Sequence, residues 1–116
     1  FDVLLTTNLF GDILSDEIAG LTGGLGPAPG PHEGEHKGIF EAVHGSAPDI
    51  AGQNIANPTA LMLGAAMMLE YLERNEDAER MRKAIRFVVG EGKVTTPDLG
   101  GKASTSEFTD EVIRNL

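Results

Sequence analysis

The chain has 116 residues, 41% of them hydrophobic and 23% charged, which is the composition of an ordinary globular protein of at most one domain. With 18 acidic and 9 basic residues its net charge is −9, which argues against nucleic acid as a partner because no basic face can be assembled. The absence of cysteine excludes disulfides, thiolate metal sites and cysteine nucleophiles. The longest apolar run, residues 60–69, is too short to cross a bilayer, so no membrane partner is expected.

The first half of the chain alternates between strand and helix patterns. An apolar, β-branched run of strand length comes first, and a segment with apolar residues at helical spacing follows it. A stretch rich in glycine and proline, without periodicity, then predicts a long loop. The predicted elements are a strand at residues 3–7, a turn at 8–11, a helix at 12–21, a loop at 23–38 and a strand at 38–43.

The second half is predicted to be mainly helical. Asn57 and Pro58 are suited to be the N-cap and the first turn of a helix. Ser104 and Glu107 have the spacing of a capping box and predict the start of a last helix. The predicted elements are a helix at residues 58–73 that is apolar nearly all round, an amphipathic helix at 76–89, a short strand or loop at 93–103, and a helix from residue 104 onward.

This alternation predicts an α/β fold. The helix at residues 58–73 needs cover on several sides, yet the few short strands supply too little sheet. We therefore expect the chain to be the C-terminal portion of a larger α/β protein and not a self-sufficient domain. The glycine-rich segment 23–26 does not make this a Rossmann fold, because Pro29 occupies the third glycine position and no strand leads directly into it.

Asp12 and Asp16 are the first candidate site. At a spacing of i, i+4 they project from one side of a helix, close enough to share a divalent cation. The predicted helix start places Asp12 in the first turn, where the helix dipole favours negative charge. Hard oxygen ligands suit Mg²⁺ or Mn²⁺, although two solvated surface acids are the commoner reading of such a pair.

Two other groups of residues could carry chemistry. His32 and His36, with Glu33 and Glu35 nearby, could bind zinc, although nothing rigid holds them. The stretch from residue 40 to 58 is rich in small residues and turn formers and ends at a helix start, which suits a polar or anionic ligand as well as an ordinary connection. Its carboxylate Asp49 could accept the hydroxyls of an adenosine ribose or merely cap a turn.

Three motifs in this order closely resemble the isocitrate/isopropylmalate dehydrogenase family, the metal-dependent β-decarboxylating dehydrogenases. They are Asn8-Leu9-Phe10-Gly11-Asp12-Ile13-Leu14-Ser15-Asp16, Gly23-Gly24-Leu25-Gly26, and His44-Gly45-Ser46-Ala47-Pro48-Asp49-Ile50-Ala51-Gly52 through Asn57-Pro58-Thr59. The resemblance covers nearly the whole chain and implies the last third of such a two-domain enzyme. Residues 1–24 would end the small, dimerisation domain with its metal-binding helix, and residues 25–116 would be the C-terminal part of the large, cofactor-binding domain.

The resemblance also implies roles for individual residues. Asp12 and Asp16 would bind Mg²⁺ or Mn²⁺ together with an Asp of the partner subunit. The cofactor NAD would be bound by Glu41 on the nicotinamide side and by His44, Gly45, Ser46, Ala47, Pro48, Asp49, Ile50, Asn57 and Asp98 on the adenosine side. Asp49-Ile50 resembles NAD-preferring members, since NADP-preferring ones tend to have Lys-Tyr there. Pro97 and Gly101 stand where NADP users often have Tyr and Arg. Departing from the family, Pro31-His32-Glu33 replaces a common Asn-Ile pair.

The implied reaction is hydride transfer from a 2-hydroxy di- or tricarboxylic acid to NAD, followed by decarboxylation. Isocitrate is the expected substrate, with 3-isopropylmalate and homoisocitrate as alternatives. A non-catalytic regulatory subunit of a hetero-oligomeric isocitrate dehydrogenase is a further alternative. The family's substrate-binding and acid/base residues lie upstream, so no catalytic residue is expected within these residues. A homodimer or larger assembly in the cytoplasm, or in the mitochondrial matrix of a eukaryote, is implied.

Overall fold

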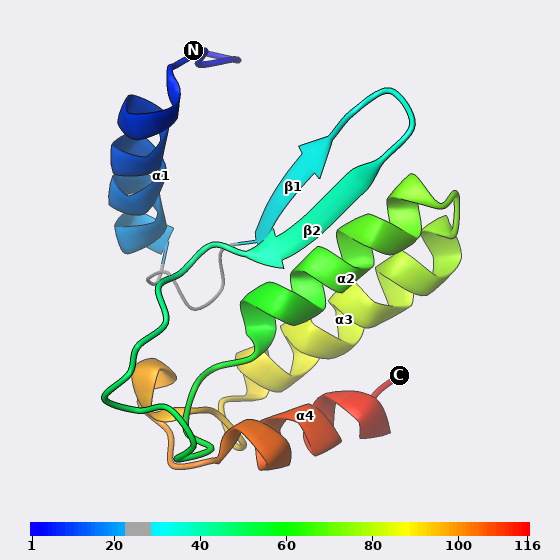
Figure 1. Ribbon diagram of the computed structural model, residues 1–116. Helices are drawn as coiled ribbons and strands as arrows, with labels where there is room; N and C mark the ends of the chain where they lie inside the picture. Colours follow the sequence, from blue (N-terminus) through cyan, green and yellow to red (C-terminus); the bar gives the residue numbers. More distant parts are fainter. Residues whose placement is uncertain (23–28) are drawn as a thin grey trace.

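The computed structural model of the protein describes residues 1–22 and 29–116. Within these residues the chain forms helices around a small sheet, in agreement with the predicted α/β class (Figure 1). The elements in chain order are α1 (Asn8–Thr22), β1 (Pro29–Glu33), β2 (Gly38–Ala42), α2 (Thr59–Tyr71), α3 (Asn75–Glu91), the short 3-10 helix η1 (Pro97–Leu99) and α4 (Thr105–Arg114). None of the helices in the described part of the chain is long and apolar enough to cross a membrane.

Strands β1 and β2 form an antiparallel hairpin in which Gly30 lies opposite Glu41 and His32 lies opposite Ile39. Helix α2 packs against this hairpin and against α3 (Figure 1). Gly64 permits a close approach, because a Cβ atom at this position would lie 3.3 Å from the carbonyl oxygen of Glu41. The backbone of β2 at Glu41 is therefore held firmly against α2.

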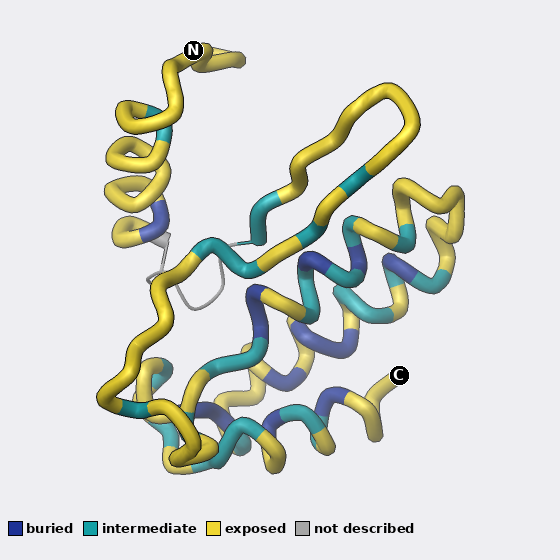
Figure 2. Tube along the Cα trace, in the orientation of Figure 1, coloured by how far each residue is buried: buried dark blue, intermediate teal, exposed yellow. Residues whose placement is uncertain are grey.

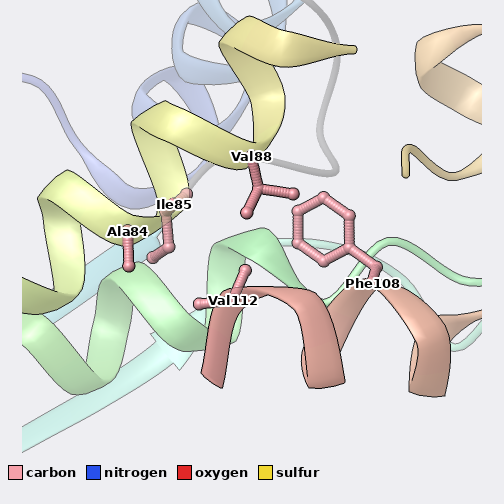
Figure 3. Close-up of a cluster of buried hydrophobic side chains, with 5 residues drawn as sticks. All are labelled: Ala84, Ile85, Val88, Phe108 and Val112. Atoms are coloured by element: carbon pink, nitrogen blue, oxygen red, sulfur yellow. The ribbon is translucent and has the colours of Figure 1, made fainter. Parts of the chain in front are cut away.

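The hydrophobic core lies between α2, α3 and α4. Phe108 of α4 is fully buried and points toward Val88 of α3 (Figure 3). The amphipathic patterns of these helices produce this arrangement, since their apolar stripes face one another. The core comprises Ala84, Ile85, Val88, Phe108 and Val112, with Met62, Leu63 and Met81 packed against it.

Helix α1 stands beside the hairpin, and most of its surface is exposed (Figure 2). Only Ala19 is buried among the residues of α1 whose burial is described. One side of the helix presents large apolar side chains to the surroundings, which is uncommon for a monomeric surface. These side chains are Leu9, Phe10, Ile13, Leu14, Ile18 and Leu21.

One expected strand is absent, and the segment expected to be a short strand or a loop is not a strand. Residues 3–7 form no strand and are exposed, because a strand needs a hydrogen-bonded neighbour and the described residues offer none. Of the two alternatives for residues 93–103 the loop is correct, and it contains a 3-10 turn with Pro97 at its start and Gly100 at its left-handed C-cap, at φ 81°. Both runs are rich in β-branched residues, which favour extended backbone without supplying a partner.

One strand was missed, and one helix begins earlier than expected. The segment 23–38, predicted to be a loop, contains β1. Its two prolines lack N–H groups, and they are tolerated because β1 pairs with one strand only, so its other edge needs no donors. Helix α1 begins at Asn8 and not at residue 12, so Asp12 lies beyond the first turn and gains little from the helix dipole. The glycine turn expected at 23–26 lies outside the described residues.

The remaining helices match the sequence closely. The strand expected at 38–43 is β2, and α2 and α3 lie within two residues of their predicted bounds. The N-cap of α2 is Pro58, one residue later than predicted, but the Asn57 side chain still accepts a hydrogen bond from the Thr59 N–H at 2.9 Å. The capping box at Ser104 and Glu107 is confirmed.

Candidate functional site

A cavity of about 420 Å³ separates α1 from the hairpin. Helix α1 contributes Asp12 and Asp16, whose i, i+4 spacing places both on the face that looks toward β1 and β2. The predicted pair of acids is therefore brought to one cavity, together with a third predicted residue, Glu41. The lining residues are Asp12, Ser15, Asp16, Gly30, His32, Glu41, Ala42, Val43, His44 and Gly45.

The chemistry of Asp12 and Asp16 fits a hard divalent cation. Among the described residues no basic side chain forms an ion pair with either carboxylate, and like charges at this spacing repel without a counterion. Within residues 1–22 and 29–116 no cluster of three or more His, Asp or Glu side chains forms a complete metal site. The two acids can thus supply part of a coordination shell, and other oxygen atoms must complete it.

On the opposite wall of this cavity, His32 and Glu41 form an ion pair. The Nε2 atom of His32 lies 2.7 Å from Oε1 of Glu41, although both side chains are more than half exposed. His36 lies instead beside Glu35, with Nε2 3.9 Å from Oε1, and its side chain is strongly exposed. The two histidines do not join the nearby acids in a zinc site, which contradicts the zinc hypothesis for the described residues.

A second, larger cavity of about 970 Å³ is formed by the segment from His44 to Asn57 together with the η1 turn and the start of α4. It brings Asn57 and Asp98 together across 41 positions of sequence, and the side-chain amide of Asn57 donates a hydrogen bond to Oδ2 of Asp98 at 2.9 Å. Most of the residues predicted for the adenosine side line this cavity: His44, Gly45, Ser46, Ala47, Ile50, Asn57 and Asp98.

Two predicted residues do not line the second cavity. Pro48 and Asp49 lie on the same exposed loop but outside the lining. The backbone carbonyl of Asp49 accepts a hydrogen bond from the Gln53 side chain at 2.7 Å, so Gln53 holds the main chain at Asp49. Ala47, one residue before Pro48, adopts the left-handed region with φ 41°, an uncommon conformation for a residue with a side chain.

The start of α4 holds the other end of this loop in place. The carbonyl of Asn54 accepts from the Thr105 N–H at 2.8 Å, and the Asn54 side chain accepts from Ser106. The Thr105 hydroxyl donates to the carbonyl of Ala56. Sequence reasoning missed Asn54 and Thr105. The capping box at Ser104 could have pointed to this contact. It marks a helix start, where the first backbone N–H groups need acceptors from outside the helix, and Thr105 is the first residue of that helix.

The two cavities share a wall. His44 and Gly45 line both of them. The ring of His44 is oriented by its Nδ1 atom, which lies 2.9 Å from the carbonyl oxygen of Gly45 and donates to it because a carbonyl can only accept. A long ligand that occupies the second cavity can therefore extend past His44 toward Asp12, Asp16 and Glu41.

Comparison with known proteins gives consistent results. The sequence model of the family described as isocitrate/isopropylmalate dehydrogenase matches residues 1–112. The chain is 59% identical to the isocitrate/homoisocitrate dehydrogenase of Thermus thermophilus over 116 residues, all of this chain and 34% of that protein. It is 53% identical to a probable mitochondrial NAD isocitrate dehydrogenase subunit alpha of Drosophila melanogaster, covering all of this chain and 31% of that protein.

The fold agrees with these sequence matches. A crystal structure of isocitrate dehydrogenase from Methylococcus capsulatus superimposes with a TM-score of 0.95 at 50% sequence identity, over 99% of this chain and 34% of that one. The chain thus spans about a third of the length of the relatives it matches.

Proposed function

Because the chain belongs to the isocitrate/isopropylmalate dehydrogenase family, we propose that it supplies metal-binding and cofactor-binding residues to an enzyme that oxidises and decarboxylates a 2-hydroxy acid with NAD and a divalent metal. Isocitrate is the proposed acid. The Thermus relative, named for isocitrate and homoisocitrate, supports a substrate of this kind.

The observation that carries the proposal is the wall shared by the two cavities. In the proposed arrangement the adenosine half of NAD occupies the cavity bordered by Asn57 and Asp98. The nicotinamide ring then reaches past His44 and Gly45 into the cavity that contains Asp12 and Asp16. This arrangement would place the hydride acceptor next to an acid held at the metal, which is the proximity that hydride transfer requires.

Asp12 and Asp16 are the proposed ligands of Mg²⁺ or Mn²⁺. Their two carboxylates meet the preference of both ions for oxygen, and the substrate and further carboxylates would complete the shell. When bound, such an ion supplies polarisation of the keto oxygen and stabilises negative charge during decarboxylation. The role of α1 is to hold both carboxylates on one face of a rigid element.

A preference for NAD over NADP is proposed from the negative charge around the second cavity. Asp98 lines that cavity, and its Oδ2 atom is engaged by Asn57, which leaves Oδ1 to accept a ribose hydroxyl. Asp49, on the same loop, would add a second charge that repels a 2′-phosphate. The name of the Drosophila relative, an NAD isocitrate dehydrogenase subunit, supports this choice.

Residues 1–24 are proposed to end the small, dimerisation domain, and residues 25–116 to belong to the large, cofactor-binding domain. The exposed apolar side of α1, with Leu9, Ile13 and Leu21, supports this division, because a face of this kind needs cover from other protein. A homodimer or larger assembly is proposed, in which a partner subunit contributes to this cover.

The intact protein tests the proposed function. With Mn²⁺ and isocitrate it is expected to reduce NAD⁺ to NADH, and Asp12→Asn is expected to lose more than about 100-fold in activity and to weaken Mn²⁺ binding, since a direct ligand costs more than an outer one. Glu17→Gln, a neutralised acid on the same helix but outside the cavity lining, is the matched control and should retain activity. Reduction of NADP⁺ but not NAD⁺ would overturn the cofactor assignment. Inactivity with isocitrate, 3-isopropylmalate and homoisocitrate would contradict the catalytic role.

A further inference from the structure

The pairing of His32 with Glu41 follows from their places on the hairpin. Gly30, not His32, lies directly opposite Glu41, so the two side chains are diagonal neighbours on one face of the sheet. A Cβ atom on Gly30 would lie 3.9 Å from Nε2 of His32 and 3.8 Å from Cγ of Glu41. Both distances are ordinary van der Waals contacts, and the atom with which a Cβ at position 30 would clash is Cγ2 of Val43, at 2.5 Å.

The backbone and side chain of Glu41 are held by different contacts. Its backbone packs against α2 at Gly64, whereas its side chain is 54% exposed. The hydrogen bond from His32 is the contact within the described residues that holds the carboxylate. Orientation of Glu41 at the edge of the cavity thus depends on one donor from the facing strand.

The lining of the cavity shows why this donor matters for Glu41. Three carboxylates line the cavity, those of Asp12, Asp16 and Glu41, and the side chains of the same lining that can carry positive charge are His32 and His44. The Nδ1 atom of His44 is directed at the carbonyl of Gly45 and not at an acid. His32 is therefore the ring in this lining that meets an acid, on the wall opposite α1.

We propose that His32 is a positioning residue for Glu41: its Nε2–H bond holds Oε1 of the carboxylate, so that Oε2 faces the cavity and accepts a hydrogen bond from the carboxamide of the nicotinamide ring. This inference rests on the proposed function. His32 stands where the family commonly has another side chain. Because His32 and Glu41 are diagonal neighbours, the donor must be an atom as far from the backbone as Nε2.

Three substitutions in the intact protein separate this role from a structural one. His32→Gln retains an N–H donor at a position close to Nε2, whereas His32→Asn places its amide too near the backbone and His32→Ala removes it. His36→Ala is the matched control, since His36 is exposed on the same hairpin and lies outside the lining of the cavity. Each variant is assayed with NAD⁺, Mn²⁺ and isocitrate. The measured quantities are kcat, the KM values for NAD⁺ and for isocitrate, and the deuterium isotope effect at the carbon that loses hydride.

The alanine and asparagine variants are expected to lose about fivefold in kcat, the effect of one charge-assisted hydrogen bond at a half-exposed site. The KM for isocitrate should stay within about twofold, and the isotope effect should rise because misorientation slows hydride transfer. The glutamine variant should recover most of the rate, and His36→Ala should match the wild type. In a Glu41→Gln background, His32→Ala should have no further effect.

The outcomes distinguish the two proposals. If the wild type oxidises isocitrate and His32→Ala does so at the same rate, the positioning role is refuted while the proposed function stands. If His32→Ala lowers kcat by the same factor with and without Glu41→Gln, or if His32→Gln does not restore kcat, the proposed action through Glu41 is refuted. A wild type that oxidises none of the three acids refutes the function itself, and the inference falls with it.

Discussion

Replacing Gly101 with alanine is expected to destabilise the turn that carries Asp98. A Cβ atom at position 101 would lie 1.9 Å from the carbonyl oxygen of Thr95 and 2.3 Å from its hydroxyl, far inside the 3.0 Å that real Cβ atoms keep. Thr95 and Thr96 are buried, at 5% and 0% exposure, so neither can swing away into solvent. The methyl group can be accommodated only if the backbone of the turn moves.

That movement breaks hydrogen bonds as well as packing. The Gly101 N–H donates to the carbonyl of Thr96 at 3.1 Å, and the carbonyl of Thr95 accepts from Ala103 at 2.9 Å. Overpacking costs roughly 1–3 kcal/mol, and each weakened backbone hydrogen bond adds about 1 kcal/mol. We therefore expect Gly101→Ala to lower the free energy of unfolding by about 3 kcal/mol and to raise the KM for NAD⁺, because η1 carries Asp98.

Urea denaturation of the intact protein measures the loss, with Gly90→Ala as the control. Gly90 lies in α3, and a Cβ atom there would meet nothing within 4 Å. This control should be neutral or up to about 1 kcal/mol more stable, as expected for glycine replaced in a helix. Equal stability of Gly101→Ala and the wild type would refute the reasoning.

The same geometry changes the weight of Gly101 as a sign of NAD preference. Its absent side chain favours NAD by resemblance, because NADP users often have arginine there. The contact with Thr95 gives this glycine a packing reason that is independent of the cofactor. Introducing arginine alone would first disrupt the turn, so a measurement of NAD⁺ and NADP⁺ binding with Asp98→Asn tests the proposed preference better than a substitution at residue 101 does.

Two further predictions concern α4. Asn54→Gly keeps access to the left-handed backbone at φ 58° but loses the hydrogen bonds to Ser106. The KM for NAD⁺ should therefore rise about fivefold with kcat nearly unchanged. An unchanged KM would contradict a role of Asn54 in holding the loop. The pKa of Glu107 is held below its ordinary value of 4.5 because the Ser104 N–H and hydroxyl donate to its carboxylate. A lowered folded-state pKa contributes stability above the unfolded value, and this contribution is lost as the pH falls through the lowered pKa. The Tm advantage of the wild type over Glu107→Gln, which does not titrate, should therefore shrink as the pH falls below the ordinary value of 4.5. A Tm difference independent of pH would contradict it.

The helices were predictable because their signals are local. Apolar spacing located α2 and α3, and Ser104 with Glu107 marked the start of α4 to the residue. Strand β1 escaped prediction because Pro29 and Pro31 are poor strand formers, and its pairing with β2 is a tertiary fact. Residues 3–7 show the converse, since strong β propensity without a neighbouring strand in the described residues produces no strand.

The candidate site was predictable in the parts that depend on helical spacing or on family resemblance. The i, i+4 spacing is enough to place Asp12 and Asp16 on one face of a helix. The meeting of Asn57 with Asp98 was implied by the resemblance and could not be derived from spacing, because it depends on where the η1 turn packs. The sequence suggested His32 as a metal ligand, and only the diagonal register of the hairpin shows its pairing with Glu41.

The shared wall of His44 and Gly45 also bears on how such a protein can change during evolution. Residues that face one cavity alone, such as Asp16 on one side and Asp98 on the other, sit on separate elements and can be replaced without disturbing the other cavity. A substitution at His44 or Gly45 alters both cavities at once. Changes in specificity should therefore arise by substitution of residues that line one cavity alone, whereas His44 and Gly45 should be the positions least free to vary.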